Sequence, residues 1–113
     1  MKPYFVLYMA SREDFEKVMS QMGSMTPDQE KEMNKEWEDW AGAQEGAVVD
    51  MGKPLGKTKR VTADKITDTK NEIGGYSIIQ ANSQDEAGKI MQTNPHFKMI
   101  PGGWIEVMEI LEM

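Results

Sequence analysis

Hydrophobic and polar residues alternate along the chain in a way that predicts four strands. Near the amino terminus, Tyr4, Val6 and Tyr8 alternate with a second apolar set, Phe5, Leu7 and Met9. A strand that is apolar on both faces has to be covered on both faces. The last strand shows the same two-sided pattern. From this periodicity and the flanking glycines we expect strands at 3–9, 46–51, 75–81 and 103–111.

Helix-start signals divide the rest of the chain into helices. Ser11, Thr26 and Ser83 are each followed three residues later by an acidic residue or a glutamine, so each side chain can satisfy a backbone donor of a first turn. Pro27 follows the second of these caps, where its missing N–H costs nothing. We therefore expect helices at 12–22, 27–45 and 84–92.

Two tryptophans, Trp37 and Trp40, fall on one face of the second expected helix. Large aromatics at helical spacing are typical of a core, and packing is the interpretation that we prefer to an aromatic ligand platform. Residues 57–71 are polar with β-branched residues among them, which predicts an exposed hairpin or a loop with a short edge strand. Six of the thirteen basic residues lie within 53–70, and we interpret them as the solvated surface of that hairpin.

The order of these elements predicts a fold class. Strand, helix in two pieces, strand, hairpin, strand, helix and strand follow one another, as in the split β-α-β arrangement of a ferredoxin-like α+β sandwich. Its helices would cover one face of a four-stranded antiparallel sheet. The other face would keep apolar side chains with no second layer to cover them, so we expect a homodimer. A chain of 113 residues is long enough for one such domain, 1–113.

Composition removes several classes of function. A formal net charge of -6 argues against binding to phosphate backbones, so no nucleic-acid partner is expected. The absence of cysteine excludes disulfides and thiolate sites, and we expect a cytoplasmic location. No apolar run approaches the roughly 20 residues of a membrane span, and the apolar amino-terminal run is better explained as a strand than as a signal peptide.

The chemistry that remains centres on the single histidine, His96. One histidine without cysteine does not make a usual zinc site, and no glycine-rich nucleotide motif occurs, so no metal and no cofactor are expected. Asp50, at the end of the second strand, is the expected carboxylate partner of His96 in proton transfer, with Asp64 and Asp68 as other possible partners. The alternative is that His96 caps the end of the last helix. Tyr8, Trp37 and Tyr76 are the candidate ligand-binding residues.

Several short motifs resemble the YCII-related or DGPF-domain family in their order along the chain. They are Gly74-Gly75-Tyr76, Ser83-x-Asp85-Glu86-Ala87, Asn94-Pro95-His96 and Gly102-Gly103-Trp104-Ile105-Glu106-Val107, with Trp37-x-x-Trp40, Gly46-x-Val48-Val49-Asp50 and Pro54-Leu55-Gly56 before them. The resemblance implies a dimeric α/β-barrel, in which two ferredoxin-like sheets pack face to face. Some related barrels process ring-derived acids.

The chain departs from the family pattern in two places. Residues 63–66 read Ala-Asp-Lys-Ile where the tetrapeptide DGPF would fall. One branch of the family resembles an enzyme with a histidine and aspartate pair near the amino-terminal helix, and this chain has no histidine there, so that pair is not carried over.

Two functional hypotheses follow. The first is a dimeric barrel that binds a small organic molecule and catalyses proton transfer, as an isomerase or lyase does. The second is a non-catalytic binding or interaction module. An apolar pocket with polar groups near His96 would favour the first hypothesis, and a filled sandwich would favour the second.

Overall fold

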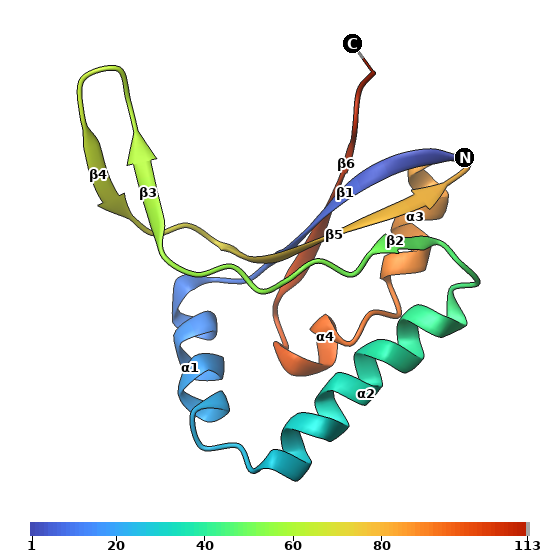
Figure 1. The fold of residues 1–113 in the computed structure, drawn as a ribbon, viewed down its shortest axis with the longest axis horizontal. Helices are drawn as coiled ribbons and strands as arrows, with labels where there is room; N and C mark the ends of the chain where they lie inside the picture. Colours follow the sequence, from blue (N-terminus) through green and yellow to red (C-terminus); the bar gives the residue numbers. More distant parts are fainter. Residues whose placement is uncertain (113) are drawn as a thin grey trace.

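A four-stranded antiparallel sheet with helices on one face forms the body of the molecule, in a computed structural model that describes residues 1–112 (Figure 1). The strand order is β2-β5-β1-β6. These strands are β1 (Lys2–Met9), β2 (Val48–Asp50), β5 (Ile73–Ala81) and β6 (Trp104–Glu109). The predicted ferredoxin-like α+β fold is confirmed, and the predicted strands are found within a few residues of their expected ends.

The helices begin where the caps predict. They are α1 (Arg12–Met22), α2 (Pro27–Ala43), α3 (Gln84–Met91) and a fourth, α4 (His96–Met99). At the start of α2, the Thr26 hydroxyl accepts from the Gln29 N–H at 3.2 Å and the Gln29 side chain accepts from the Thr26 N–H at 3.0 Å. The short helix α4 was not predicted, because four residues give no periodicity to detect.

The hairpin of β3 (Thr58–Val61) and β4 (Ile66–Thr69) forms a separate two-stranded sheet that projects from the body (Figure 1). This confirms the predicted exposed hairpin. Lys59 and Asp68 pair across its two strands. Its apolar side chains Val61 and Ile66 are exposed, so the hairpin adds nothing to the core of the chain.

The core lies between the sheet and the helices. On β1, Tyr4, Val6 and Tyr8 point toward the helices and are buried, and Ile79 on β5 lies beside them. Helices α2 and α3 contribute Trp40, Ala87 and Met91. The indole N–H of Trp40 donates to the Thr93 hydroxyl at 3.0 Å, and Trp37 packs half-buried against the same cluster. The packing interpretation of both tryptophans is thereby confirmed.

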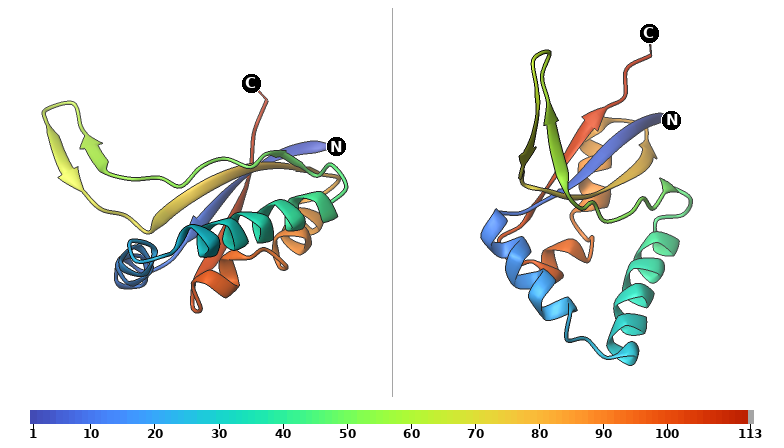
Figure 2. Two further views of the ribbon diagram at one scale, coloured as in Figure 1. Left: turned by 60° about the horizontal axis from the view of Figure 1, so that its bottom comes forward. Right: turned by 60° about the vertical axis from the view of Figure 1, so that its left-hand side comes forward.

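The opposite face, which we call the open sheet face, carries Phe5, Leu7, Tyr76 and Ile78 from the two central strands. All four are half-buried, and the rings of Phe5 and Tyr76 stack at 5.8 Å. Figure 2 (left) shows the helices on one side of the sheet only. Within residues 1–112, none of the helices is long and apolar enough to cross a lipid bilayer.

Candidate functional site

Four polar side chains lie under the carboxyl end of β1, and we call them the buried polar cluster: Tyr8, Ser77, Asn94 and His96. The Tyr8 hydroxyl lies 2.7 Å from the Ser77 hydroxyl, which in turn donates to the Met51 carbonyl at 2.7 Å. Ser77 has one hydroxyl proton and donates it to the Met51 carbonyl, so Tyr8 has to be the donor in its bond with Ser77. The direction of this hydrogen-bond chain is therefore fixed.

His96 is only 3% exposed, and its Nε2 lies 2.8 Å from the Met9 carbonyl. A carbonyl only accepts, so Nε2 carries the proton. Gly103 makes this approach feasible, because a Cβ at that position would lie 2.9 Å from Nε2. Burial lowers the pKa of His96, and its backbone hydrogen bonds with Met9 and Trp104 oppose that shift. A neutral imidazole thus ties the end of β1 to α4.

Asn94 organises the turn that enters α4. Its side-chain oxygen accepts from the His96 N–H at 2.8 Å, while its buried amide nitrogen has no hydrogen bond of good geometry. The amide is nonetheless close enough to Tyr8 to influence it. Burial raises the pKa of the Tyr8 hydroxyl, and the side chains of Ser77 and Asn94 partly offset that rise. Tyr8 is therefore a protonated donor at neutral pH.

Asp50 does not join this cluster. It is exposed, its carboxylate accepts from the Gly52 N–H at 2.8 Å, and it pairs with Ile78 on the open sheet face. No hydrogen bond or ion pair joins it to His96 within residues 1–112. Asp50 and His96 were expected to lie side by side, but β2, which carries Asp50, is an edge strand beside β5. The pairing places Asp50 opposite mid-strand residues, whereas His96 lies at the far end of β1.

The helix-capping alternative for His96 also needs correction. His96 opens α4, and the last turn of α3 ends earlier, at the cap Gln92. A buried neutral imidazole at a helix start gives no favourable charge to a helix carboxyl end. The residue holds the backbone of β1 instead.

The three candidate ligand-binding residues divide between the two faces of the sheet. Tyr8 and Trp37 meet edge to face with ring centres 5.2 Å apart on the helix side. Tyr76 is on the open sheet face, beside Phe5. The Trp37 indole N–H donates to the sulfur of Met99 at 3.2 Å, so Trp37 connects Tyr8 to α4.

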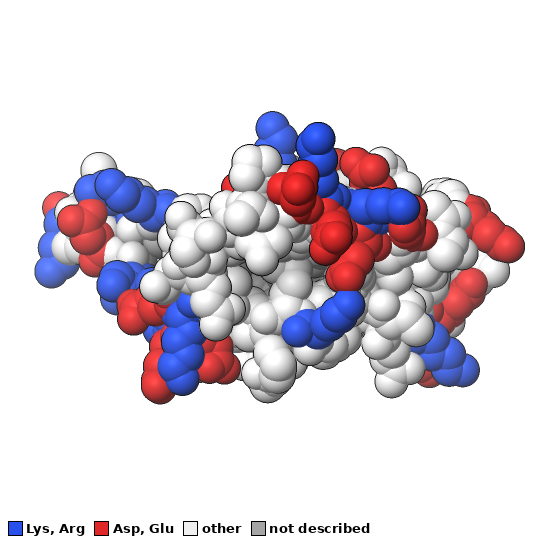
Figure 3. Space-filling model, turned by 90° about the horizontal axis from the view of Figure 1, so that it is seen from below, with Lys and Arg blue, Asp and Glu red and all other residues white. Residues whose placement is uncertain are grey.

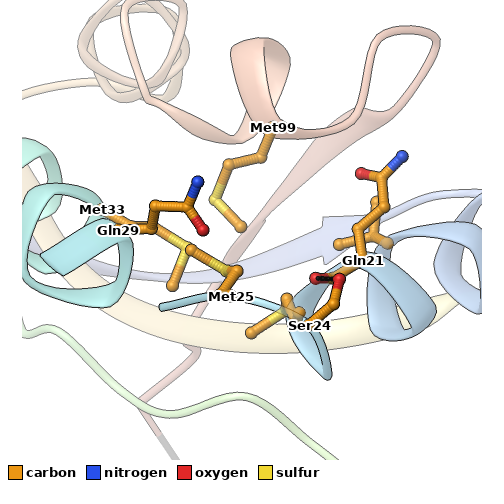
Figure 4. A pocket seen from close by; sticks show the side chains of 8 residues that line it. Gln21, Ser24, Met25, Gln29, Met33 and Met99 are labelled. Atoms are coloured by element: carbon orange, nitrogen blue, oxygen red, sulfur yellow. Dashed lines mark hydrogen bonds between the residues drawn. The ribbon is translucent and has the colours of Figure 1, made fainter. Parts of the chain in front are cut away.

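Beyond Met99 lies a cleft of about 510 Å³ between α1, the turn that follows it, α2 and α4. We call it the methionine cleft. Its apolar lining is Val18, Met22, Met25, Met33 and Met99, and its polar lining is Gln21, Ser24 and Gln29. Figure 4 shows Met25, Met33 and Met99 extending toward one another from three different segments. None of the four cluster residues, and neither Asp50 nor Tyr76, lines it.

The methionine cleft has no charged side chain in its lining. Seen from below (Figure 3), the middle of this face is mostly uncharged and hollowed, with acidic and basic side chains at its edge. Within residues 1–112, no group of three His, Asp or Glu side chains is placed to hold a metal ion. The cleft was not predicted from the sequence, in which the one available signal was the high count of eleven methionines.

Comparison with known proteins identifies one domain family. The family model of the YCII-related domain matches residues 4–113, which is nearly the whole chain. A search of curated proteins found no match.

Proposed function

The chain belongs to the YCII-related domain family, and on this premise we propose that it is a homodimeric protein that binds a small organic molecule in the methionine cleft. The observation that carries the proposal is the cleft itself. Its volume of about 510 Å³ is in the range of small-molecule sites, and its lining combines apolar side chains with a few polar ones. Methionine side chains adapt to the shape of a ligand at little cost.

The dimer is supported by the open sheet face. The two central strands carry a continuous apolar strip, and no helix of residues 1–112 lies over it. Its residues are Phe5, Leu7, Tyr76 and Ile78. Contiguous apolar surface of this kind marks an interaction site. A second copy of the same sheet would cover the strip and complete a dimeric α/β-barrel.

Sedimentation equilibrium tests the dimer. Leu7→Lys places a charge in the middle of the open sheet face and should convert a dimer into a monomer at micromolar concentration. Val61→Lys is the matched control, because Val61 is 70% exposed on the hairpin and lies outside that face. A wild-type chain that sediments as a monomer at micromolar concentration would refute the dimer.

Ligand binding is tested by a metabolite-library thermal-shift screen, because a ligand that binds only the folded state raises its stability. Hits should be lost in Met25→Trp, whose indole fills the cleft. They should be kept in Met19→Trp, a position on α1 six residues earlier that is 68% exposed and outside the lining. Hits that survive Met25→Trp unchanged would place the ligand elsewhere.

In this proposed function the buried polar cluster has a structural role, and neither His96 nor Asp50 transfers a proton. Nε2 of His96 is occupied by the Met9 carbonyl, and the imidazole does not line the cleft. The second candidate, an interaction module whose dimer interface is its main product, is favoured by the open sheet face. It becomes the better explanation if the screen finds no ligand.

A further inference from the structure

We infer that the ligand of the methionine cleft is an uncharged aromatic molecule with a hydrogen-bond acceptor. This inference rests on the proposed function, since it specifies what binds in that cleft. It differs from the ring-derived acids that the family resemblance suggests. Three features of the cleft support it: the missing charge, the sulfur lining and the position of Gln29.

The missing charge argues against an ionic ligand. Charged residues make up 28% of the chain, yet the cleft lining contains none. A carboxylate, phosphate or ammonium group that leaves water needs an opposite charge or several hydrogen bonds as compensation. The lining supplies no opposite charge, so the part of its hydration that a charged ligand loses in the cleft is not replaced by an ion pair. A neutral ligand loses little.

The sulfur lining favours an aromatic ring. Met22, Met25, Met33 and Met99 supply four thioethers to one cleft. Sulfur contacts with aromatic rings are favourable by about 0.3–1.5 kcal/mol each. The Trp37 N–H donates to the Met99 sulfur and so holds that side chain at the inner wall. The other three methionines can adjust around a flat ring.

Gln29 supplies the polar contact. Its Oε1 accepts from the Thr26 N–H at 3.0 Å, which directs the oxygen of the amide toward the start of α2. Its Nε2 makes no hydrogen bond within residues 1–112, and Gln29 is one of the residues that line the cleft. The two N–H donors on Nε2 are therefore available to a carbonyl or amide oxygen on the ligand.

The test compares three probes of nearly equal shape: 2-naphthamide, 2-naphthoate and 2-naphthylmethylammonium. Binding is followed by the ¹³C-labelled methyl signals of methionine, with Met22, Met25, Met33 and Met99 assigned through single leucine substitutions. We expect 2-naphthamide to shift these four signals with a Kd at least tenfold below that of either ion. An equal or lower Kd for 2-naphthoate or 2-naphthylmethylammonium would overturn the inference and leave the proposed function standing.

A charge substitution sharpens the test. Gln29→Glu keeps an acceptor for the Thr26 N–H, so the helix start is preserved, but removes the Nε2 donor and adds a negative charge. It should weaken 2-naphthamide at least fivefold and strengthen the ammonium probe. Asn34→Asp makes the same charge change on an exposed position of α2 outside the lining and should change neither Kd.

Two further outcomes have defined meanings. If Gln29→Glu and Asn34→Asp affect the probes equally, the contact with Gln29 is refuted. If none of the three probes shifts the four methyl signals and the metabolite screen also finds no ligand for the cleft, the proposed function fails together with the inference.

Discussion

Ile78 and Ile79 are adjacent isoleucines whose side chains lie on opposite faces of β5. Their burial shows how the two faces of the sheet differ. Ile79 is completely buried against the helices, whereas Ile78 is half-buried on the open sheet face. Since the side chains are identical, only their cover differs. Within residues 1–112 the helices cover one face of a sheet that is apolar on both sides, and the dimer proposed above would cover the other.

The two faces also differ in their polar content. The helix face encloses Tyr8, Ser77, Asn94 and His96, whose hydrogen bonds are made to one another or to the backbone. On the open sheet face, the polar contacts stay near the rim, such as the Trp104 indole N–H with the Glu106 carboxylate at 2.8 Å. Buried polar groups require such partners, and exposed ones can use water. Apart from the amide nitrogen of Asn94, the cluster on the helix face therefore meets this requirement.

The largest expected effect separates the faces directly. Ile79→Ala should lower the free energy of unfolding by about 2–5 kcal/mol, because it leaves a cavity in a packed core. Ile78→Ala should cost about 1 kcal/mol within one subunit, because less apolar area is lost from a half-buried site. Chemical denaturation monitored by tryptophan fluorescence measures both.

Protein concentration provides the control for this pair. If the open sheet face is a dimer interface, the Tm of Ile78→Ala should fall more steeply on dilution than that of the wild type. Equal losses of stability for the two variants, with no dependence on concentration, would show that the faces do not differ in cover as described.

Most of the fold could be predicted because its signals are local. The alternation of Tyr4 to Met9 sets a strand, and Thr26 with Pro27 and Gln29 sets the start of α2. These signals depend on residues a few positions apart. The expected ends of α1, at 12 and 22, agree with the structure for the same reason.

The site could not be predicted in the same way. The neighbourhood of His96 and Asp50 depends on which strand lies beside which and on register, and the β2–β5 pairing placed Asp50 with Ile78. The methionine cleft depends on the angle at which α1 and α2 diverge from the turn at Ser24 (Figure 1). Local periodicity determines neither the angle between two helices nor the register between two strands.

A smaller effect is expected from two tyrosine hydroxyls, one on each face. Tyr8→Phe removes the donor to Ser77 but leaves Ser77 bonded to Met51, so the expected loss is about 0.5–1.5 kcal/mol. Tyr76→Phe, on the open sheet face, should change the free energy of unfolding by less than about 0.5 kcal/mol. Urea denaturation of both variants distinguishes them. A larger loss for Tyr76→Phe would mean that its hydroxyl has a role on the open sheet face that the single chain does not reveal.

The smallest effect is a pH dependence that arises from His96 on the covered face. Burial lowers the pKa of His96 below its ordinary value of 6.5, so at mildly acidic pH the unfolded chain binds a proton that the folded chain does not. The stability contribution is complete above about pH 6.5 and is lost as the pH falls from there through the lower pKa of the folded state. One proton limits the slope to about 1.4 kcal/mol per pH unit.

The variant that isolates this slope is His96→Gln, which keeps an N–H donor for the Met9 carbonyl but does not titrate. Urea denaturation of both proteins between pH 7.5 and 5 gives their free energies of unfolding, and the carboxylates common to both largely cancel in the difference. The wild type should lose stability faster than the variant as the pH falls, whatever the offset between them at pH 7.5. Parallel curves would show that the imidazole is protonated as easily in the folded chain as in the unfolded one. That result would mean that water reaches His96, and the covered face would then be less closed than its burial indicates.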